Sequence, residues 1–249
     1  MARAALRGRL TWQLGTVEEV VRENQRTASI VLRVPDWPGH RAGQHVDVRL
    51  TAEDGYRAQR SYSIASAPED DAIVLTVERL DDGEVSSYLV GDLRGGDELE
   101  LRGPIGGYFV WEEPMGGPLM LIAGGSGIAP LRAMLRHRLA RKSAVPVRLL
   151  YSARTHHDLT YRAELSLLAA EAGVDVRVTL TREQPVGWQG YDRRIDRALI
   201  AEVAWPPAER PLAYVCGPTS FVEAAADAMV SLGHEPSRIR TERFGPTGR

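Results

Sequence analysis

The chain has 249 residues, a hydrophobic fraction of 43% and a formal net charge of −2 at pH 7. This length and apolar content allow two modest domains or one large one, with buried cores. The near balance of charges argues against bulk binding of nucleic acid or of a membrane surface. Cys216 is the only cysteine, which excludes an internal disulfide and the thiolate sets of iron–sulfur clusters and structural zinc sites. If the chain moves electrons, we expect any iron–sulfur centre to lie on another protein.

The N-terminal segment carries positive charges, but no apolar stretch of a leader peptide follows them. No part of the sequence approaches a membrane span of roughly 20 apolar residues. We therefore expect a cytoplasmic location by default.

The first half predicts short strands separated by turns. The predicted strands alternate in polarity or are rich in β-branched residues, and they cover 16–21, 28–34, 45–50, 61–65 and 73–79. Turn residues such as Pro38, Gly39, Asp54 and Gly55 separate them. Regular short strands of this kind favour a barrel or a sandwich.

Two segments of this half are of interest beyond the fold. The sequence Arg-Ser-Tyr-Ser at 60–63 closes one predicted strand, and 83–89 predicts a turn that leads into a helix with the Ser86 hydroxyl near its start. Taken alone, the first segment indicates no more than the end of a strand, and the second no more than the start of a helix.

The second half alternates between strand and helix patterns, which predicts a parallel sheet with helices on both faces. The predicted strands are 119–123, 147–151, 174–180 and 212–216, and the predicted helices are 130–141, 161–172, 198–204 and 220–232. The stretch 112–118 is the richest in Pro and Gly between the two rhythms. We therefore predict a first domain over 1–113 and a second over 114–249.

A glycine-rich turn follows the first strand of the second half. Gly124, Gly125 and Gly127 stand between that strand and the helix that Pro130 begins. Glycines let the backbone approach a pyrophosphate, and the helix N-terminus offers N–H donors and a positive dipole. The spacing alone is equally consistent with a tight strand-to-helix turn, but its place in a βα series favours a nucleotide.

The residues at the ends of the next two predicted strands indicate which nucleotide binds. An NAD-selective site would place an acid near the end of the second strand, where this chain has Ser152 and Arg154; Arg182 ends the third strand, and Arg194 is a further candidate. Arginine binds phosphate with two donors of its planar fork. We therefore predict that NADPH is favoured over NADH, although any one of these arginines could be a solvated surface residue.

Taken in order, these motifs resemble the ferredoxin–NADP reductase superfamily. The resemblance also uses 103–106 (Gly-Pro-Ile-Gly) and Cys216-Gly217-Pro218 after the last strand, and it extends from 42–45 to 242–244. It implies an antiparallel flavin-binding β-barrel followed by an α/β nucleotide-binding domain. The implied activity is that of an NAD(P)H oxidoreductase similar to oxygenase reductase components but without a fused iron–sulfur domain. Electrons would pass from NADPH through FAD to a separate ferredoxin or oxygenase iron–sulfur component.

The resemblance also implies roles for individual residues. Arg60 would pair with the flavin phosphate, Tyr62 would lie against the isoalloxazine, and Ser63 would approach its N5 atom. The helix start at Gly83, Val85 and Ser86 would meet a pyrophosphate, which implies FAD, with FMN as the alternative. Cys216, followed by Gly217 and Pro218, would lie near the nicotinamide C4 and complete the catalytic pair with Ser63. Phe244 either stacks on the flavin or packs in the core.

Other functions stay open at this stage. The enzyme could reduce a small acceptor such as a quinone or free flavin, or the chain could be a flavin-binding redox subunit without turnover of its own. His156 and His157 are adjacent in the sequence, and two adjacent side chains of a helix or a strand do not face one ion. We therefore predict no metal site.

Overall fold

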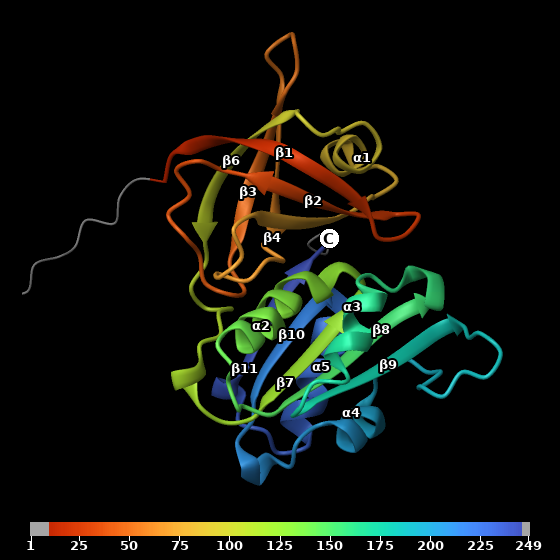
Figure 1. Ribbon diagram of the computed structural model, residues 1–249. Helices are drawn as coiled ribbons and strands as arrows, with labels where there is room; N and C mark the ends of the chain where they lie inside the picture. The colour runs from red at the N-terminus through yellow and green to blue at the C-terminus, as the bar shows by residue number, and fades with distance from the viewer. Residues whose placement is uncertain (1–9, 246–249) are drawn as a thin grey trace, which may run out of the picture.

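The computed structural model describes residues 10–245. Residues 1–9, which carry the positive charges considered above for a leader peptide, and residues 246–249 lie outside the described residues. A β-barrel stands on an α/β domain, with the two halves of the chain above and below one another in Figure 1. This is the two-domain fold that the sequence predicted.

The barrel is a six-stranded antiparallel sheet in the order β4-β3-β6-β1-β2-β5. A bridge between Ile64, which follows β4, and Leu75, which lies within β5, joins the two edge strands, so the sheet closes on itself. Alternate side chains fill the interior, as the pleat requires. The strands are β1 (Trp12–Arg22), β2 (Thr27–Arg33), β3 (His45–Thr51), β4 (Arg57–Ser63), β5 (Ile73–Glu78) and β6 (Glu98–Ile105).

Helix α1 (Glu84–Gly91) packs Val85, Leu89 and Val90 into the barrel core. The predicted helix start after Gly83 is therefore confirmed. Strand β6 was absent from the predicted strands, although its first five residues alternate between exposed or half-buried polar side chains and buried leucines.

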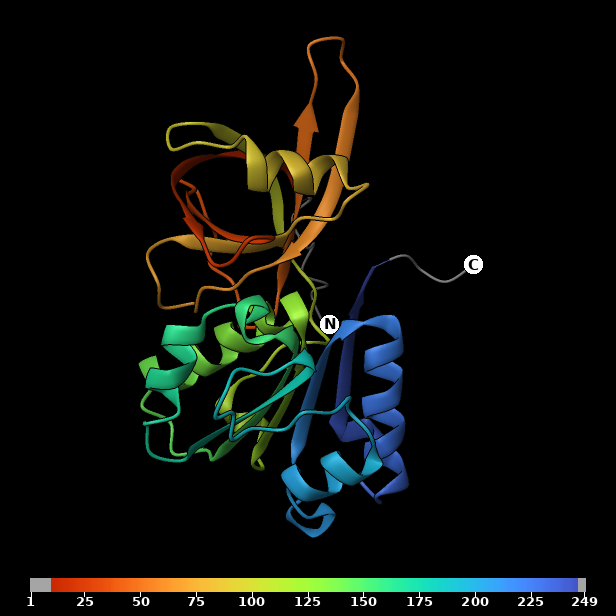
Figure 2. The same cartoon turned by 90° about the vertical axis from the view of Figure 1, so that its right-hand side faces the viewer.

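The second domain is a five-stranded parallel sheet in the order β11-β10-β7-β8-β9. Figure 2 shows α2 and α3 on one face of the sheet and α4 and α5 on the other. β7 is buried on both faces, which explains its continuous apolar sequence. The elements are β7 (Leu119–Gly124), α2 (Ile128–Ala140), β8 (Val147–Thr155), α3 (Arg162–Leu168), β9 (Val174–Glu183), α4 (Arg197–Val203), β10 (Leu212–Pro218), α5 (Thr219–Ser231) and β11 (Ile239–Phe244).

The order of the strands creates a crevice. From β7 the chain proceeds to β8 and β9 on one side and then crosses to β10 and β11 on the other. The carboxyl ends of β7 and β10 therefore flank a topological switch point, where open α/β sheets bind ligands. In Figure 1 this end of the sheet faces the barrel.

Polar contacts hold the two domains together. Arg136 on α2 makes two hydrogen bonds to Asp70 of the barrel, at 2.7 and 2.9 Å, and Ser29 of β2 donates to the Tyr161 hydroxyl at 3.1 Å. Tyr161 was predicted to begin a helix, but its φ of +61° places it in the left-handed region just before α3. These contacts set the orientation of the barrel over the crevice.

Among the residues that the structure describes, no helix is long and apolar enough to cross a bilayer. The barrel strands end at Ile105 and the parallel sheet begins at Leu119, with the short η1 turn (Glu113–Met115) between them. The division into 1–113 and 114–249 stays a prediction.

Candidate functional site

Two adjoining pockets lie between the domains. The barrel pocket has about 860 Å³ of open space and is lined by Arg60, Ser61, Tyr62, Ser63, Thr76, Glu78, Leu80, Gly83, Val85, Ser86, Ser126, Ala129, Phe244 and Gly245. The sheet pocket has about 750 Å³ and is lined by Asn24, Arg26, Thr27, Glu78, Gly124, Gly125, Ser126, Ser152, Ala153, Arg154, Asp158, Thr160, Thr181, Pro218, Phe221 and Phe244. Glu78, Ser126 and Phe244 belong to both walls, so the pockets meet.

Strand β4 supplies the cation, the aromatic ring and the hydroxyl of the barrel pocket. The Arg60 guanidinium is exposed and donates to the Gln59 carbonyl at 2.7 Å. Tyr62 packs partly on the barrel core, and burial raises the pKa of its phenol, while the nearby Arg60 lowers it. The pocket therefore offers a cation for a phosphate and a neutral aromatic surface for a ring.

The N-terminus of α1 forms another part of the barrel pocket. The Ser86 hydroxyl accepts from the Leu80 N–H at 3.1 Å and donates to the Gly83 carbonyl at 3.2 Å. A β-carbon on Gly83 would stand 2.3 Å from that hydroxyl oxygen, so the tight turn needs glycine. A helix N-terminus with a close backbone approach favours a bound anion.

The Glu242 carboxylate lies between the two predicted catalytic residues in the sense that it bonds to Ser63 and its residue is the strand neighbour of Cys216. Ser63 donates to Glu242 Oε1 at 2.8 Å, across 179 positions of sequence, and Glu242 pairs in register with Cys216 on β10. Burial raises the pKa of Glu242, and the Ser63 hydrogen bond opposes that shift. Burial and Glu242 also raise the pKa of Cys216, so the sulfur is held as a neutral thiol.

The sheet pocket is built from backbone turns. Gly124 neighbours Ser152 in register, and Gly125 adopts a φ of +55°, which favours glycine. A β-carbon on Gly127 would lie 2.2 Å from the Cys216 carbonyl oxygen. The β7–α2 turn therefore packs directly on the end of β10.

Most predicted binding residues line one of these pockets, and some do not. Outside the pocket walls lie Gly127, Arg182, Arg194, Cys216 and Gly217. Cys216 is 1% exposed, so it stands beneath the wall, and its role beside the nicotinamide stays a prediction.

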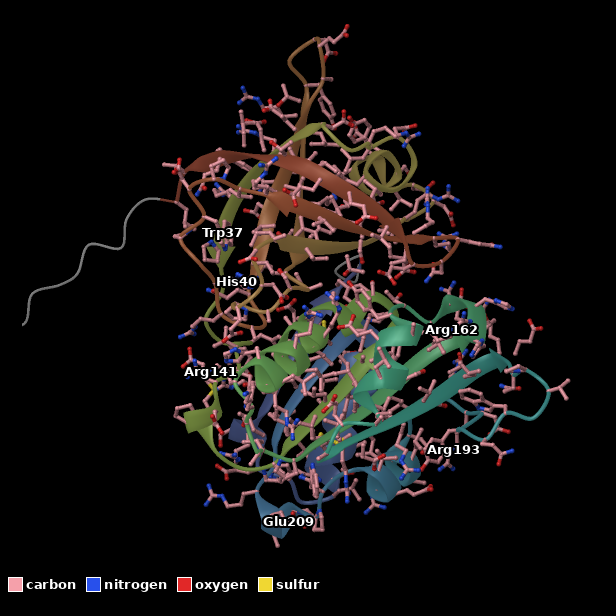
Figure 3. The ribbon with its side chains drawn as sticks, viewed as in Figure 1. Trp37, His40, Arg141, Arg162, Arg193 and Glu209 are labelled. Carbon is pink, nitrogen blue, oxygen red and sulfur yellow. The ribbon has the colours of Figure 1, made fainter. Side chains whose placement is uncertain are left out.

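The two distal arginines lie apart from the sheet pocket for a structural reason. Thr181 lines the pocket, while the exposed Arg182 follows it on a strand whose side chains alternate. Arg194 follows Arg193, which pairs with Glu202 of α4 at 3.4 Å and lies far from the barrel in Figure 3. Arg154 is therefore the predicted arginine that the structure brings to the pocket.

Several residues that line the sheet pocket or contact Ser63 have no local signal in the sequence. Asn24, Arg26 and Glu78 come from the barrel yet reach the sheet pocket. Glu242 belonged to the 242–244 motif, but nothing local pointed to its contact with Ser63. Such contacts depend on how the domains face one another, which no local pattern reports.

The histidine pair does not form part of a metal cluster. The His156 and His157 rings meet edge to face at 6.2 Å. Within residues 10–245, no group of three His, Cys, Asp or Glu side chains is arranged to hold an ion.

The residues of the barrel pocket fit a flavin nucleotide. Tyr62, Val85 and Phe244 offer surface to a ring system, while Arg60 and the start of α1 offer charge and dipole to phosphates. The adjoining sheet pocket fits a second nucleotide at a switch-point turn. Two such ligands in pockets that share walls would lie close enough to react.

Comparisons with known proteins agree with this geometry. The oxidoreductase FAD-binding domain family matches residues 15–110, and the oxidoreductase NAD-binding domain family matches residues 121–227. An aromatic O-demethylase reductase subunit of an Amycolatopsis species is 32% identical over 96% of this chain and 72% of its own length. The FAD/NAD-binding domain of a nitric oxide dioxygenase from Vibrio cholerae superposes with a TM-score of 0.84 at 27% identity, covering 94% of this chain and 99% of that domain.

A glycine betaine monooxygenase reductase subunit of Chromohalobacter salexigens is 32% identical over 82% of this chain. The match spans 56% of that relative's length, so this chain corresponds to only part of it.

Proposed function

We propose that this chain, which belongs to the ferredoxin–NADP reductase superfamily of FAD- and NAD-binding oxidoreductases, is a reductase that takes electrons from NADPH. FAD is its bound cofactor. The recipient is a separate one-electron carrier, either a ferredoxin or the iron–sulfur component of an oxygenase. The observation that carries the proposal is the shared wall of Glu78, Ser126 and Phe244 between the two pockets. Relatives named as reductase subunits of a monooxygenase and of an O-demethylase support this type of recipient.

The residues of the barrel pocket have separate tasks. Arg60 and the N-terminus of α1 would hold the FAD phosphates, and Tyr62 and Phe244 would bound its ring system. When bound there, FAD would accept a hydride and release its electrons one at a time. The chain's main contribution is then position, because a near-attack geometry of about 3–3.5 Å lowers the barrier of transfer.

Ser63 would lie beside the reacting atoms, and Glu242 fixes its orientation through the 2.8 Å hydrogen bond. Cys216 supports this arrangement from below, as a neutral thiol next to the Gly127 turn. Burial raises the pKa of Glu242 and its hydrogen-bond partner is the Ser63 hydroxyl, so this carboxyl would be suited to exchange a proton near Ser63.

The preference for NADPH over NADH is the finer part of this proposal. Ser152 and Arg154 stand at the end of β8, where an acid would select NADH. Arg154 is exposed, without an ion pair within residues 10–245, and so has its donors available for a 2′-phosphate.

An absorption spectrum of the purified protein tests the proposal. We expect one flavin per chain, and bleaching of its band when NADPH is added without oxygen. Bleaching without transfer to any ferredoxin or oxygenase component, but with rapid reduction of quinones, would favour a reductase of small acceptors. A protein that binds no added flavin would exclude the proposal.

A further inference from the structure

The charged side chains that line the sheet pocket balance one another. Its lining includes two arginines, Arg26 and Arg154, and two carboxylates, Glu78 and Asp158. Arg26 is already paired with Asp81 at 2.9 Å, and Asp158 caps its own turn. Among the described residues of this pocket, Arg154 and Glu78 are therefore the charged side chains that make neither an ion pair nor a side-chain hydrogen bond. The pocket has no excess of positive charge to attract a pyrophosphate.

Within the described part of the chain, Glu78 is the unpaired carboxylate of this pocket, and it lies where the two pockets meet. It is the last residue of β5, it is half-buried, and it belongs to the walls of both pockets. Its Oε2 atom lies 3.7 Å from the position that a β-carbon on Gly125 would occupy. The barrel thus presents a carboxylate to the glycine turn of the opposite domain.

The same glycine turn leads into α2, through the short η2 turn (Gly125–Gly127). Helix α2 begins there with its positive dipole end, and no described side chain caps its start, so the turn favours an anion. A carboxylate so close to this turn would repel a second anion that binds there, because like charges at short range in a partly buried site are weakly screened.

We propose that Glu78 is an internal competitor of the nucleotide phosphates and limits the affinity of the sheet pocket for NADPH and NADP⁺. The proposal rests on the proposed function, since it takes the sheet pocket to be the nucleotide site. Weak binding has a use in a reductase, because release of the oxidised nucleotide can limit turnover. Glu78 is thus an affinity-determining residue that acts by charge.

The test is a calorimetric titration of NADP⁺ into oxidised protein kept saturated with FAD. Glu78→Gln keeps the shape of the side chain and removes its charge, so we expect the dissociation constant to fall about fivefold at low ionic strength. Added salt should reduce this difference only in part, because a half-buried charge is screened less than an exposed one. Glu19→Gln is the matched control, because this exposed carboxylate lies on β1 outside both pockets. The Glu19→Gln variant should bind NADP⁺ with the dissociation constant of the wild type.

Two further variants make the outcome decisive. Glu78→Ala should also bind NADP⁺ more tightly, whereas Glu78→Asp keeps the charge and should stay near the wild type. If the neutral variants bind more weakly, Glu78 instead accepts a hydrogen bond from the ligand, and the proposal is wrong. Unchanged affinity in both neutral variants would overturn it as well. A wild-type protein that binds neither FAD nor NADP⁺ would instead overturn the proposed function, and this inference with it.

Discussion

The two pockets differ in the kind of wall that surrounds them. The barrel pocket is lined mainly by side chains of one domain, from β4, β5 and the segment that ends in α1. The sheet pocket is lined mainly by strand ends and turns of the other domain, with the barrel closing one side. A ligand in the barrel pocket would be held by the Arg60 guanidinium and the Tyr62 ring, whereas a ligand in the sheet pocket would lie against the backbone.

This difference fits two kinds of ligand. A cofactor that stays bound gains from side chains whose positions a closed sheet and a packed helix hold in place. A substrate that enters and leaves gains from small residues at a strand edge, which allow a close approach with few side chains to reorder. We therefore expect substitutions in the barrel pocket to affect retention of flavin and those in the sheet pocket to affect nucleotide binding.

The largest expected effect is at Gly127, where the backbone of the sheet pocket is most constrained. A β-carbon in Gly127→Ala would lie 2.2 Å from the Cys216 carbonyl oxygen, so the turn or β10 must move. We expect a loss of about 3 kcal/mol or more in the free energy of unfolding, together with loss of nucleotide binding. Thermal unfolding and NADP⁺ titration measure both.

The control for this variant is Gly91→Ala. Gly91 ends α1, and a β-carbon there meets no atom within 4 Å. Its stability should stay within about 1 kcal/mol of the wild type. A Gly127→Ala protein that unfolds and binds nucleotide like the wild type would show that the close backbone approach does not matter.

The next largest effect tests the barrel pocket. Arg60→Ala removes the exposed guanidinium of that pocket, and a charge-assisted hydrogen bond to phosphate contributes about 1.5–3 kcal/mol. The dissociation constant of FAD should rise roughly ten- to a hundredfold, as measured by flavin fluorescence on removal of FAD. Affinity for NADP⁺ at saturating FAD should hardly change. An equal loss of both ligands would contradict the separation of the two pockets.

A smaller effect is expected at the two predicted catalytic residues, Ser63 and Cys216. Ser63→Ala removes the hydroxyl that Glu242 orients, and a small misplacement of reacting groups slows transfer, here by roughly tenfold or more. Rapid mixing should show a lower limiting rate of flavin reduction at saturating NADPH, with little change in the apparent binding constant. Cys216→Ala should have a weaker effect, because Cys216 is buried beneath the wall. A change in binding alone would show that these roles are wrong.

Glu242 adds a pH test to the same region. Burial raises its folded pKa, so protonation stabilises the folded state. That contribution is fully present below the unfolded pKa of about 4.3 and is lost as pH rises through the raised folded pKa. Glu242→Gln should therefore be more stable than the wild type at neutral pH, and the advantage should vanish in acid. Thermal unfolding across that range measures the difference, and a constant difference would exclude titration of Glu242.

The sequence predicted the fold well where patterns are local. Strands such as β7 are apolar throughout because both faces are covered, and the turns after Ala123 and before Val85 have clear glycine signals. Strand β11 was not predicted, since its six residues Ile-Arg-Thr-Glu-Arg-Phe carry little apolar pattern and pair with a single neighbour at the sheet edge.

The site was predictable only in part. Arg60, Tyr62, Ser63 and Arg154 stand in short motifs that a reader can recognise, and each lines a pocket. Glu78 could not be identified from its sequence neighbours, because its importance arises from the Gly125 turn of the other domain. Arg182 lies outside both pocket walls for a related reason: side chains alternate along β9, and Thr181 is the residue that lines the sheet pocket. The role of Arg182 in nucleotide binding stays a prediction.

An effect of about one order of magnitude is expected on the choice between the two nucleotides. Arg154 lies in the sheet pocket and Arg182 does not, so only Arg154→Ala should remove a contact to a 2′-phosphate. One such contact contributes about 1.5 kcal/mol when partly solvated, or roughly tenfold in affinity. We therefore expect Arg154→Ala to lower the ratio of kcat/KM for NADPH over NADH by about tenfold, chiefly through KM. Arg182→Ala serves as the matched control, since it removes the same charge from the next strand end. Equal losses in both variants would mean that a diffuse positive field, rather than a contact, selects NADPH, and the effect would then weaken strongly with salt. A wild-type enzyme that prefers NADH would leave the two-pocket architecture intact and show that Ser152 and Arg154 serve the ribose hydroxyls instead.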